Sequence, residues 1–64
     1  MKNRLRELRE EKGLTQQALA RLIAMSQTGY SKYETGENDI PTKILIKLAD
    51  YYKVTIGYLL GVED

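Results

Sequence analysis

The 64-residue sequence contains no cysteine and no histidine. Disulfide bonds, thiolate nucleophiles and imidazole bases are therefore excluded, together with the side chains that most often hold zinc. No apolar run approaches the roughly 20 residues that cross a bilayer, and no basic segment followed by an apolar stretch marks a secretory leader. We expect no metal, no cofactor and no membrane segment, and a cytoplasmic location.

An excess of charge of one sign is also lacking, because ten basic residues face nine acidic ones and the net charge is +1. Such a balance attracts a polyanion only weakly, so any contact with nucleic acid must depend on local arrangement. Basic side chains are most frequent near the N-terminus, where glutamates alternate with them as on a solvated helix face. Arg4 and Lys12 are the candidates there for outer phosphate contacts.

The alternation typical of β-strands is missing, and apolar residues instead recur at helical spacing throughout the chain. Breaks in this spacing divide the chain into five short helices, and its length allows one domain, residues 1–64. Each predicted helix has a side chain that can accept a hydrogen bond from a first-turn amide: Asn3, Thr15, Ser26, Thr42 and Thr55. Gly13 and Gly36 suit the left-handed position that follows a helix, and Pro41 directs the chain into the fourth.

Residues 15–34 contain two of these helices, of about two turns each, and their connection has the length of a helix-turn-helix. The second helix carries a polar face formed by Gln27, Thr28, Ser31 and Lys32. Glutamine can pair with adenine, lysine can donate to guanine, and a threonine methyl can pack on thymine. These side chains are therefore candidate base-reading residues, although in an arbitrary helix they would be a solvated face.

Phosphate contacts are expected at the two helix starts, where amides after Thr15 and Ser26 are free to donate. The Gln16 side chain could add to them, although glutamine is also simply a good helix former behind a threonine cap. Gly29 lies inside the second helix, where glycine is unfavourable by roughly 1 kcal/mol. It indicates either a close approach of a phosphate backbone or a loosely packed helix.

An ordered set of short motifs covers nearly the whole chain: LRELR at 5–9, GLTQ at 13–16, Leu19-Ala20, Ser26, Tyr33-Glu34, Gly36, Pro41, LIKLA at 45–49 and YLLG at 58–61. This set resembles the phage repressor and Cro family of helix-turn-helix domains. The resemblance implies an all-α, lambda-repressor-like bundle of five helices. It also implies a small transcriptional repressor or regulator that places its third helix in the major groove of a double-stranded DNA operator.

Individual roles follow from the resemblance for the positions that match. It implies that Gln16 holds a phosphate, that the four residues of the polar face meet the bases, and that Arg9 and Glu34 form an internal ion pair. The chain departs from the family at Ala24, where glycine is common, so the turn is expected to be helical or mildly strained. It departs again at Tyr30, which replaces a small aliphatic residue and whose hydroxyl needs a partner or a route to the surface.

The loop Glu37–Asp39 is a third departure, because many relatives place basic residues there and two acids would oppose DNA. This loop and the near-neutral charge support an alternative reading, a protein–protein interaction module such as an antitoxin or anti-repressor partner that no longer reads DNA. An enzyme is not expected, because nothing beside Ser31 and Lys32 supplies an oxyanion site or a deep cleft.

A homodimer on a two-fold-related operator is the expected assembly, because one recognition helix reaches only a few base pairs. Tyr58, Leu59 and Val62 near the C-terminus form the expected dimer surface, since they add apolar area beyond what a small core can bury.

Overall fold

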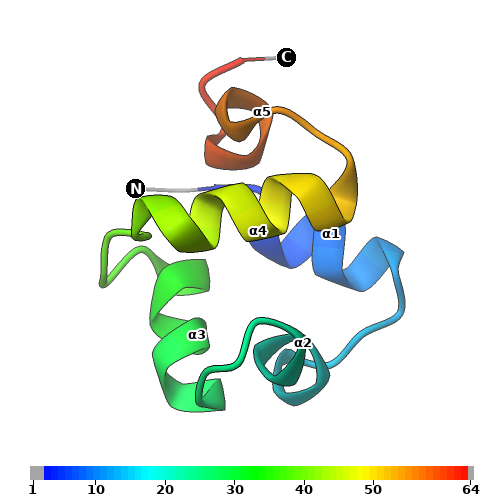
Figure 1. The fold of residues 1–64 in the computed structure, drawn as a ribbon, viewed down its shortest axis with the longest axis vertical. Coiled ribbons are helices and arrows are strands. Elements are labelled where there is room, and N and C mark those ends of the chain that lie inside the picture. The colour runs from blue at the N-terminus through cyan, green and yellow to red at the C-terminus, as the bar shows by residue number, and fades with distance from the viewer. Residues whose placement is uncertain (1–2, 64) are drawn as a thin grey trace.

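The computed structural model describes residues 3–63. Within that range the chain forms helices and no strand: α1 (Leu5–Glu11), α2 (Gln16–Leu22), α3 (Gln27–Thr35), α4 (Thr42–Tyr52) and α5 (Ile56–Leu60). Figure 1 shows α4 across the middle of the molecule, with α2 and α3 below it and α5 above it. The predicted all-α bundle of five helices is confirmed.

Three helices begin at the predicted capping residues. Thr15, Ser26 and Thr55 each accept a hydrogen bond from the backbone N–H three residues later, at 3.0 to 3.1 Å. These bonds satisfy amides that have no partner inside the helix, so each start is fixed by its own sequence. Two of the three, Thr15 and Ser26, open α2 and α3.

Of the other two predicted caps, Thr42 is wrong, whereas Asn3 makes the predicted hydrogen bond from one residue before the cap position. Thr42 is the first residue of α4, and Pro41 occupies the cap position without a side-chain bond. Arg4 rather than Asn3 occupies the cap of α1. Asn3 nevertheless accepts a hydrogen bond from the N–H of Leu5 at 3.0 Å, and its amide donates to the carbonyl of Tyr33 at 2.8 Å. The N-terminal segment is thereby tied to α3.

Left-handed residues end the helices and turn the chain. Gly13 and Gly36 have φ values of +69° and +83°, as their predicted positions require. Ala24 follows α2 and has a φ of +57°, while the N–H of Met25 donates to the carbonyl of Ala20 at 3.0 Å and closes the turn. An L-residue in this conformation is strained by about 1 kcal/mol. The sequence left open whether the turn at Ala24 is helical or mildly strained, and the structure shows the strained conformation.

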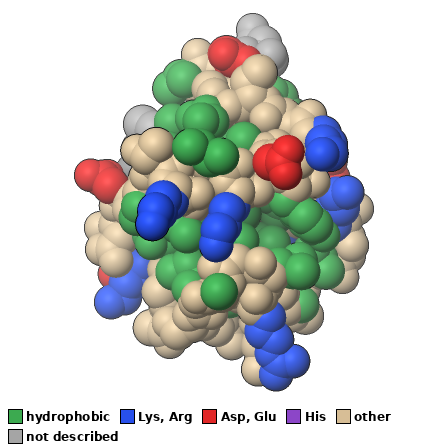
Figure 2. All heavy atoms as spheres, viewed as in Figure 1, with side chains coloured by type: hydrophobic (Ala, Val, Ile, Leu, Met, Phe, Trp, Pro, Cys, Tyr) green, Lys and Arg blue, Asp and Glu red, His purple; other side chains and the backbone are tan. Residues whose placement is uncertain are grey.

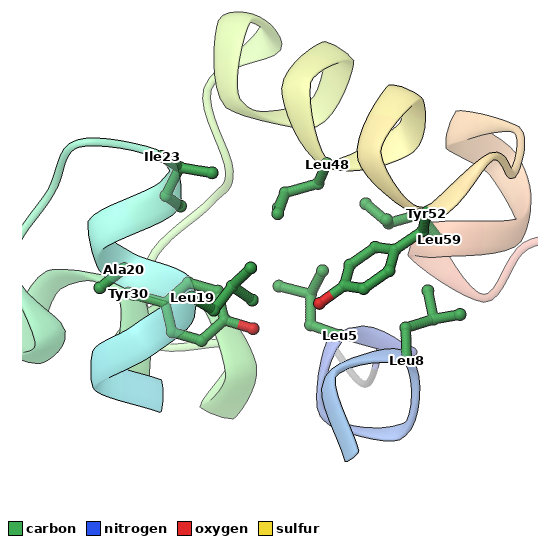
Figure 3. Packing of buried hydrophobic residues seen from close by; sticks show 9 residues of the cluster. All are labelled: Leu5, Leu8, Leu19, Ala20, Ile23, Tyr30, Leu48, Tyr52 and Leu59. Carbon is green, nitrogen blue, oxygen red and sulfur yellow. The ribbon is translucent and has the colours of Figure 1, made fainter. Parts of the chain in front are cut away.

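The core contains side chains from all five helices: Leu5, Leu8, Leu19, Ala20, Ile23, Tyr30, Leu48, Tyr52 and Leu59 (Figure 3). Leu59 is fully buried, so its assignment to a dimer surface is wrong. Leu59 is buried because α5 has only five residues and packs on the bundle through this one leucine. Burial of a leucine contributes about 2 kcal/mol, more than a helix of five residues could gain from local bonds.

Tyr30 is the largest fully buried side chain, and its hydroxyl neither reaches the surface nor finds a hydrogen-bond partner among residues 3–63. Burial, followed by the nearby Glu34 carboxylate, raises the pKa of Tyr30, so the phenol stays neutral. Burial also raises the pKa of Tyr52 to about 12. Figure 3 shows both hydroxyls directed into the interior. The expectation that the Tyr30 hydroxyl finds a partner or the surface is therefore wrong.

A buried ion pair holds α3 against α1. Arg9 Nε lies 2.6 Å from Glu34 Oε2, and Arg9 Nη2 donates to Glu34 Oε1 at 3.2 Å. Only 11% of the Arg9 side chain and 4% of the Glu34 side chain are exposed. Arg9 Nη1 also donates to the carbonyl of Leu14 at 2.8 Å, which fixes the connection into α2. One guanidinium therefore sets the relative positions of the first three helices.

Replacing Ala24 with glycine should raise the free energy of unfolding by about 1 kcal/mol, because glycine adopts the left-handed conformation without steric strain. The exposed methyl group of Ala24 contributes little packing. Urea denaturation of wild type and variant measures the difference. Ala18→Gly, the same chemical change inside α2, is the control and should lower the free energy by about 1 kcal/mol. An Ala24→Gly protein less stable than wild type would contradict the strain.

Arg9→Ala should destabilise the domain by about 3 kcal/mol, because the buried Glu34 carboxylate loses both bonds of its counter-ion. Arg6→Ala is the matched control, since Arg6 pairs with Glu10 at 3.3 Å on the exposed surface of the same helix. That change should cost no more than about 0.5 kcal/mol. Thermal unfolding followed by circular dichroism measures both, and Arg9→Lys supplies an intermediate value if Arg9→Ala does not fold. Equal losses at Arg6 and Arg9 would exclude a dominant buried pair.

Candidate nucleic-acid interface

The α2–α3 unit presents two capped helix starts close to one another in the chain. Residues 23–26 connect the helices, with the left-handed Ala24 directing the chain from the end of α2 to Ser26. α2 buries Leu19 and Ala20, and α3 buries Tyr30, so both helices dock through apolar faces. The polar side of α3 is consequently left toward solvent.

A hollow of about 370 Å³ lies along this polar side, lined by Gln16, Gln27, Thr28, Ser31, Lys32 and Glu37. All four base-reading candidates from the sequence are among its walls. Gln27, Thr28 and Lys32 are exposed, and Ser31 is half-buried. The hollow thus gathers amide, hydroxyl, ammonium and carboxylate groups, which together can pair with every donor and acceptor of a base edge.

Gln16 joins this hollow from the first residue of α2. Its side-chain nitrogen donates to Glu34 Oε1 at 3.0 Å, a contact that sequence reasoning did not find. The second N–H and the carbonyl oxygen of the amide are not used by that bond. The Gln16 amide therefore uses one N–H to bind Glu34 and keeps its second N–H available for another acceptor.

The Glu34 carboxylate is the centre of a small polar cluster. Burial raises the pKa of Glu34, but hydrogen bonds from Arg9 and Gln16 and the neighbouring Tyr30 hydroxyl outweigh burial, and the pKa lies below its ordinary value. The Tyr30 hydroxyl lies near the carboxylate without the geometry of a hydrogen bond. Arg9 has its pKa raised, first by the hydrogen bond to Glu34. Both charges are thus retained at neutral pH.

Gly29 lies close to the cap of α3 and to the side chain of Met25. A Cβ at this position would lie 3.0 Å from the Met25 Cε and 3.2 Å from the Ser26 Oγ. That same oxygen accepts the N–H of Gly29 at 3.1 Å, which caps α3. The Met25 methyl is the end of a flexible side chain that can shift, so this packing does not by itself require glycine, while the Ser26 hydroxyl is occupied within the protein.

The two N-terminal candidates for phosphate contacts lie away from the hollow. The guanidinium of Arg4 donates to the carbonyls of Tyr58 and Glu63 at 3.0 and 2.8 Å and stacks 4.2 Å from the Tyr58 ring. The ammonium of Lys12 lies 5.4 Å from the ring of Tyr51. Arg4 is thus committed to holding the C-terminal segment, a role that its position in the sequence did not reveal.

Glu37 also lines the hollow, although the sequence placed it only in a loop whose acidic residues would repel DNA. The left-handed Gly36 reverses the chain after α3, and Glu37 then returns to the polar side of that helix. The available signal was Gly36 itself, which predicts a reversal but not its direction. On the face shown in Figure 2, basic side chains are spread out and do not form one patch, in keeping with the net charge of +1.

The C-terminal surface differs from the expected one. Val62 is 69% exposed and Tyr58 is half-buried beneath Arg4, while Leu59 lies in the core. Ile56, which the sequence did not single out, is 37% exposed. Residues 3–63 contain no helix with the length and hydropathy of a membrane span. The same residues hold no cluster of three or more acidic, histidine or cysteine side chains suited to a metal ion.

Comparison with known proteins relates the chain to bacterial and phage regulators. It is 38% identical to the uncharacterized HTH-type transcriptional regulator YobD of Bacillus subtilis, over 95% of this chain and 54% of YobD. It is 36% identical to the HTH-type transcriptional regulator ImmR of the same organism, over 95% of this chain and 48% of ImmR. The cryptic phage CTXphi transcriptional repressor RstR of Vibrio cholerae is 38% identical over 95% of this chain and 54% of RstR.

The chain therefore spans about half the length of these curated relatives. No solved structure matches it significantly. The helix-turn-helix family matches residues 5–59, which include all of α1 to α4 and most of α5. With that match and the capped α2–α3 unit, the chain belongs to the helix-turn-helix family.

Proposed function

We propose that the protein is a sequence-specific regulator of transcription that binds double-stranded DNA with α3 in the major groove. The observation that carries the proposal is the hollow in which Gln16 meets the polar side of α3. The major groove is about 12 Å wide and admits one helix, and the side chains along α3 can pair with base edges. The relatives named as transcriptional regulators support the same function.

Base reading falls to Gln27, Thr28, Ser31 and Lys32 in this proposal, because they line the hollow from α3. Phosphate contact falls to Gln16 and to the backbone amides that begin α2 and α3, where the helix dipole favours an anion. Ser26 would then contribute through its own backbone N–H, Gly29 would offer no donor because its N–H is engaged by the Ser26 cap, and Lys12 is an outer contact at most. Arg4 is left out of the proposed contacts because its guanidinium is already paired.

A homodimer on a two-fold-related operator completes the proposal. Half-sites would lie one turn of DNA apart, about 34 Å, as in other helix-turn-helix dimers. A contact between the copies through α5 is supported by two residues of the dimer surface expected from the sequence, Val62 and Tyr58. The exposed side chain of Ile56 adds to their apolar area. The regulator would act where its operator lies, in the cytoplasm, and by binding rather than by catalysis.

The second candidate function is a protein–protein interaction module that no longer reads DNA. Glu37 and Asp39 favour it, because they place two carboxylates in the loop after α3, and Glu37 also lines the hollow. Salt distinguishes the two functions. For binding to DNA, the logarithm of the binding constant falls with the logarithm of the salt concentration, with a slope of about 0.9 per neutralised phosphate. The affinity of a largely apolar protein contact does not fall in this way.

Selection of duplexes from a randomised DNA pool at near-physiological salt tests the proposed function. We expect the retained duplexes to share a palindromic motif, because two copies of α3 would read two-fold-related half-sites. Sequencing of the retained pool measures the enrichment, and circular dichroism of the same preparation verifies the folded state. A pool that stays random with folded protein would overturn DNA reading and favour the protein–protein module.

Substitutions in the hollow should separate base reading from phosphate contact. Gln27→Ala and Thr28→Ala should each relax base preference at one or two positions by roughly tenfold, while Gln16→Ala should weaken binding similarly on all sequences. Fluorescence anisotropy on the selected duplex and its single-base variants measures both effects. Because Gln16 also bonds to Glu34, binding is measured at a temperature where every variant is folded. Equal loss of discrimination in all three variants would contradict this division of roles.

A further inference from the structure

The hollow beside α3 contains one cation and one anion, Lys32 and Glu37. Both side chains are exposed, and neither belongs to an ion pair among residues 3–63. The proposed DNA contact explains Lys32 but not Glu37, since a carboxylate brought near phosphates and stripped of water weakens binding unless it gains a donor. Glu37 therefore needs a partner on the DNA if it is to remain in the hollow when the complex forms.

The backbone around Glu37 is held in place by α3. Gly36 turns the chain with a φ of +83°, and the N–H of Glu37 donates to Thr35 Oγ1 at 3.3 Å. One residue later, the N–H of Asn38 donates to the carbonyl of Lys32 at 3.2 Å. Two hydrogen bonds thus anchor the loop to the last turn of the helix. The turn after α3 thus brings the Glu37 side chain to the polar side of that helix.

The chemistry of the major groove restricts what a carboxylate can contact. An ionised glutamate only accepts hydrogen bonds, and the base edges in the major groove offer two donors, the amino groups of cytosine and adenine. The adenine amino group stands next to N7, another acceptor, whose lone pair would face the carboxylate. The cytosine amino group has no acceptor beside it on its own base. Cytosine is therefore the base that fits Glu37.

Lys32 fits the base opposite that cytosine. Guanine presents O6 and N7, both acceptors, and the ammonium group of lysine only donates. Within one G·C pair, the major-groove edge thus changes from acceptors on guanine to a donor on cytosine. Lys32 and Glu37 line one hollow with the complementary change, from donor to acceptor.

We propose that Lys32 and Glu37 together read one G·C pair in each half-site, with Lys32 donating to guanine and Glu37 accepting from the cytosine amino group. This inference rests on the proposed function, because it assigns a base pair to the same hollow. It also gives the acidic loop a role in specificity, where a phosphate contact would require a basic residue.

Anisotropy titrations on the selected duplex, with each base pair exchanged in turn, test the pairing. For wild type, exchange of one G·C pair for A·T should weaken binding roughly tenfold, because thymine O4 would replace the cytosine donor. Glu37→Ala should reduce the discrimination at that pair to less than about twofold and leave the other positions unchanged. Lys32→Ala should lose preference at the same pair. Glu37→Gln keeps an acceptor oxygen without the charge and should retain part of the preference.

Glu11→Gln is the control for charge alone, since Glu11 is exposed on α1 and lines a different hollow. It should leave every base preference as in wild type. Equal strengthening of binding to all duplexes by Glu37→Ala would mean that Glu37 only repels phosphate, and would overturn the inference. Preferences lost at different pairs for Lys32→Ala and Glu37→Ala would overturn it as well. If the wild-type protein selects no DNA sequence, the proposed function fails and the inference fails with it. If the wild type selects a sequence and the Glu37→Ala variant keeps the same base preferences, only the inference fails.

Discussion

The arrangement of the helix-turn-helix depends on the buried contact between Arg9 and Glu34. Two bonds join these side chains across α1 and α3, a third bond fixes the connection before α2, and Gln16 adds the first residue of α2 to the same carboxylate. Breaking a buried pair from one side strands a charge at a cost of several kcal/mol, a large share of the stability of so small a domain. Because Gln16 is also a wall of the hollow beside α3, the contact that stabilises the fold also positions the surface proposed to meet DNA.

Local signals in the sequence predicted the helices well. Thr15 and Ser26 act as caps through their own side chains, and Gly36 adopts a conformation that other residues avoid, so each can be recognised without knowing the fold. Tertiary features were harder to predict. Whether Leu59 faces the core depends on how α5 docks against α4, and a helix of five residues shows too little periodicity to decide this.

The candidate site was predictable where it follows one helix and unpredictable where it is built from a turn. Gln27 and Lys32 share a face because of helical spacing alone, and the hollow contains both. Glu37 lies beyond the helix, and its approach to the same hollow depends on the reversal at Gly36 and on the bond from Asn38 to the carbonyl of Lys32. The sequence alone indicates only that Glu37 lies in an acidic loop, whereas the fold places Glu37 in the same hollow as Lys32.

A nearly neutral chain changes how DNA binding must be distributed between phosphates and bases. Phosphate neutralisation contributes equally on every sequence, so a protein with few free cations at its interface gains little non-specific affinity. Arg4 and Arg9 are engaged inside the protein, and Lys32 shares its hollow with a carboxylate. In the proposed complex, most of the binding energy of one copy would then come from base contacts, each of which discriminates against a wrong base by about 1 to 3 kcal/mol, and one helix reaches only a few base pairs. In the proposed homodimer, pairing two copies on one operator would add the contacts of the second half-site at high effective concentration, so the weak electrostatics of this chain would favour a dimer more than those of a strongly basic chain.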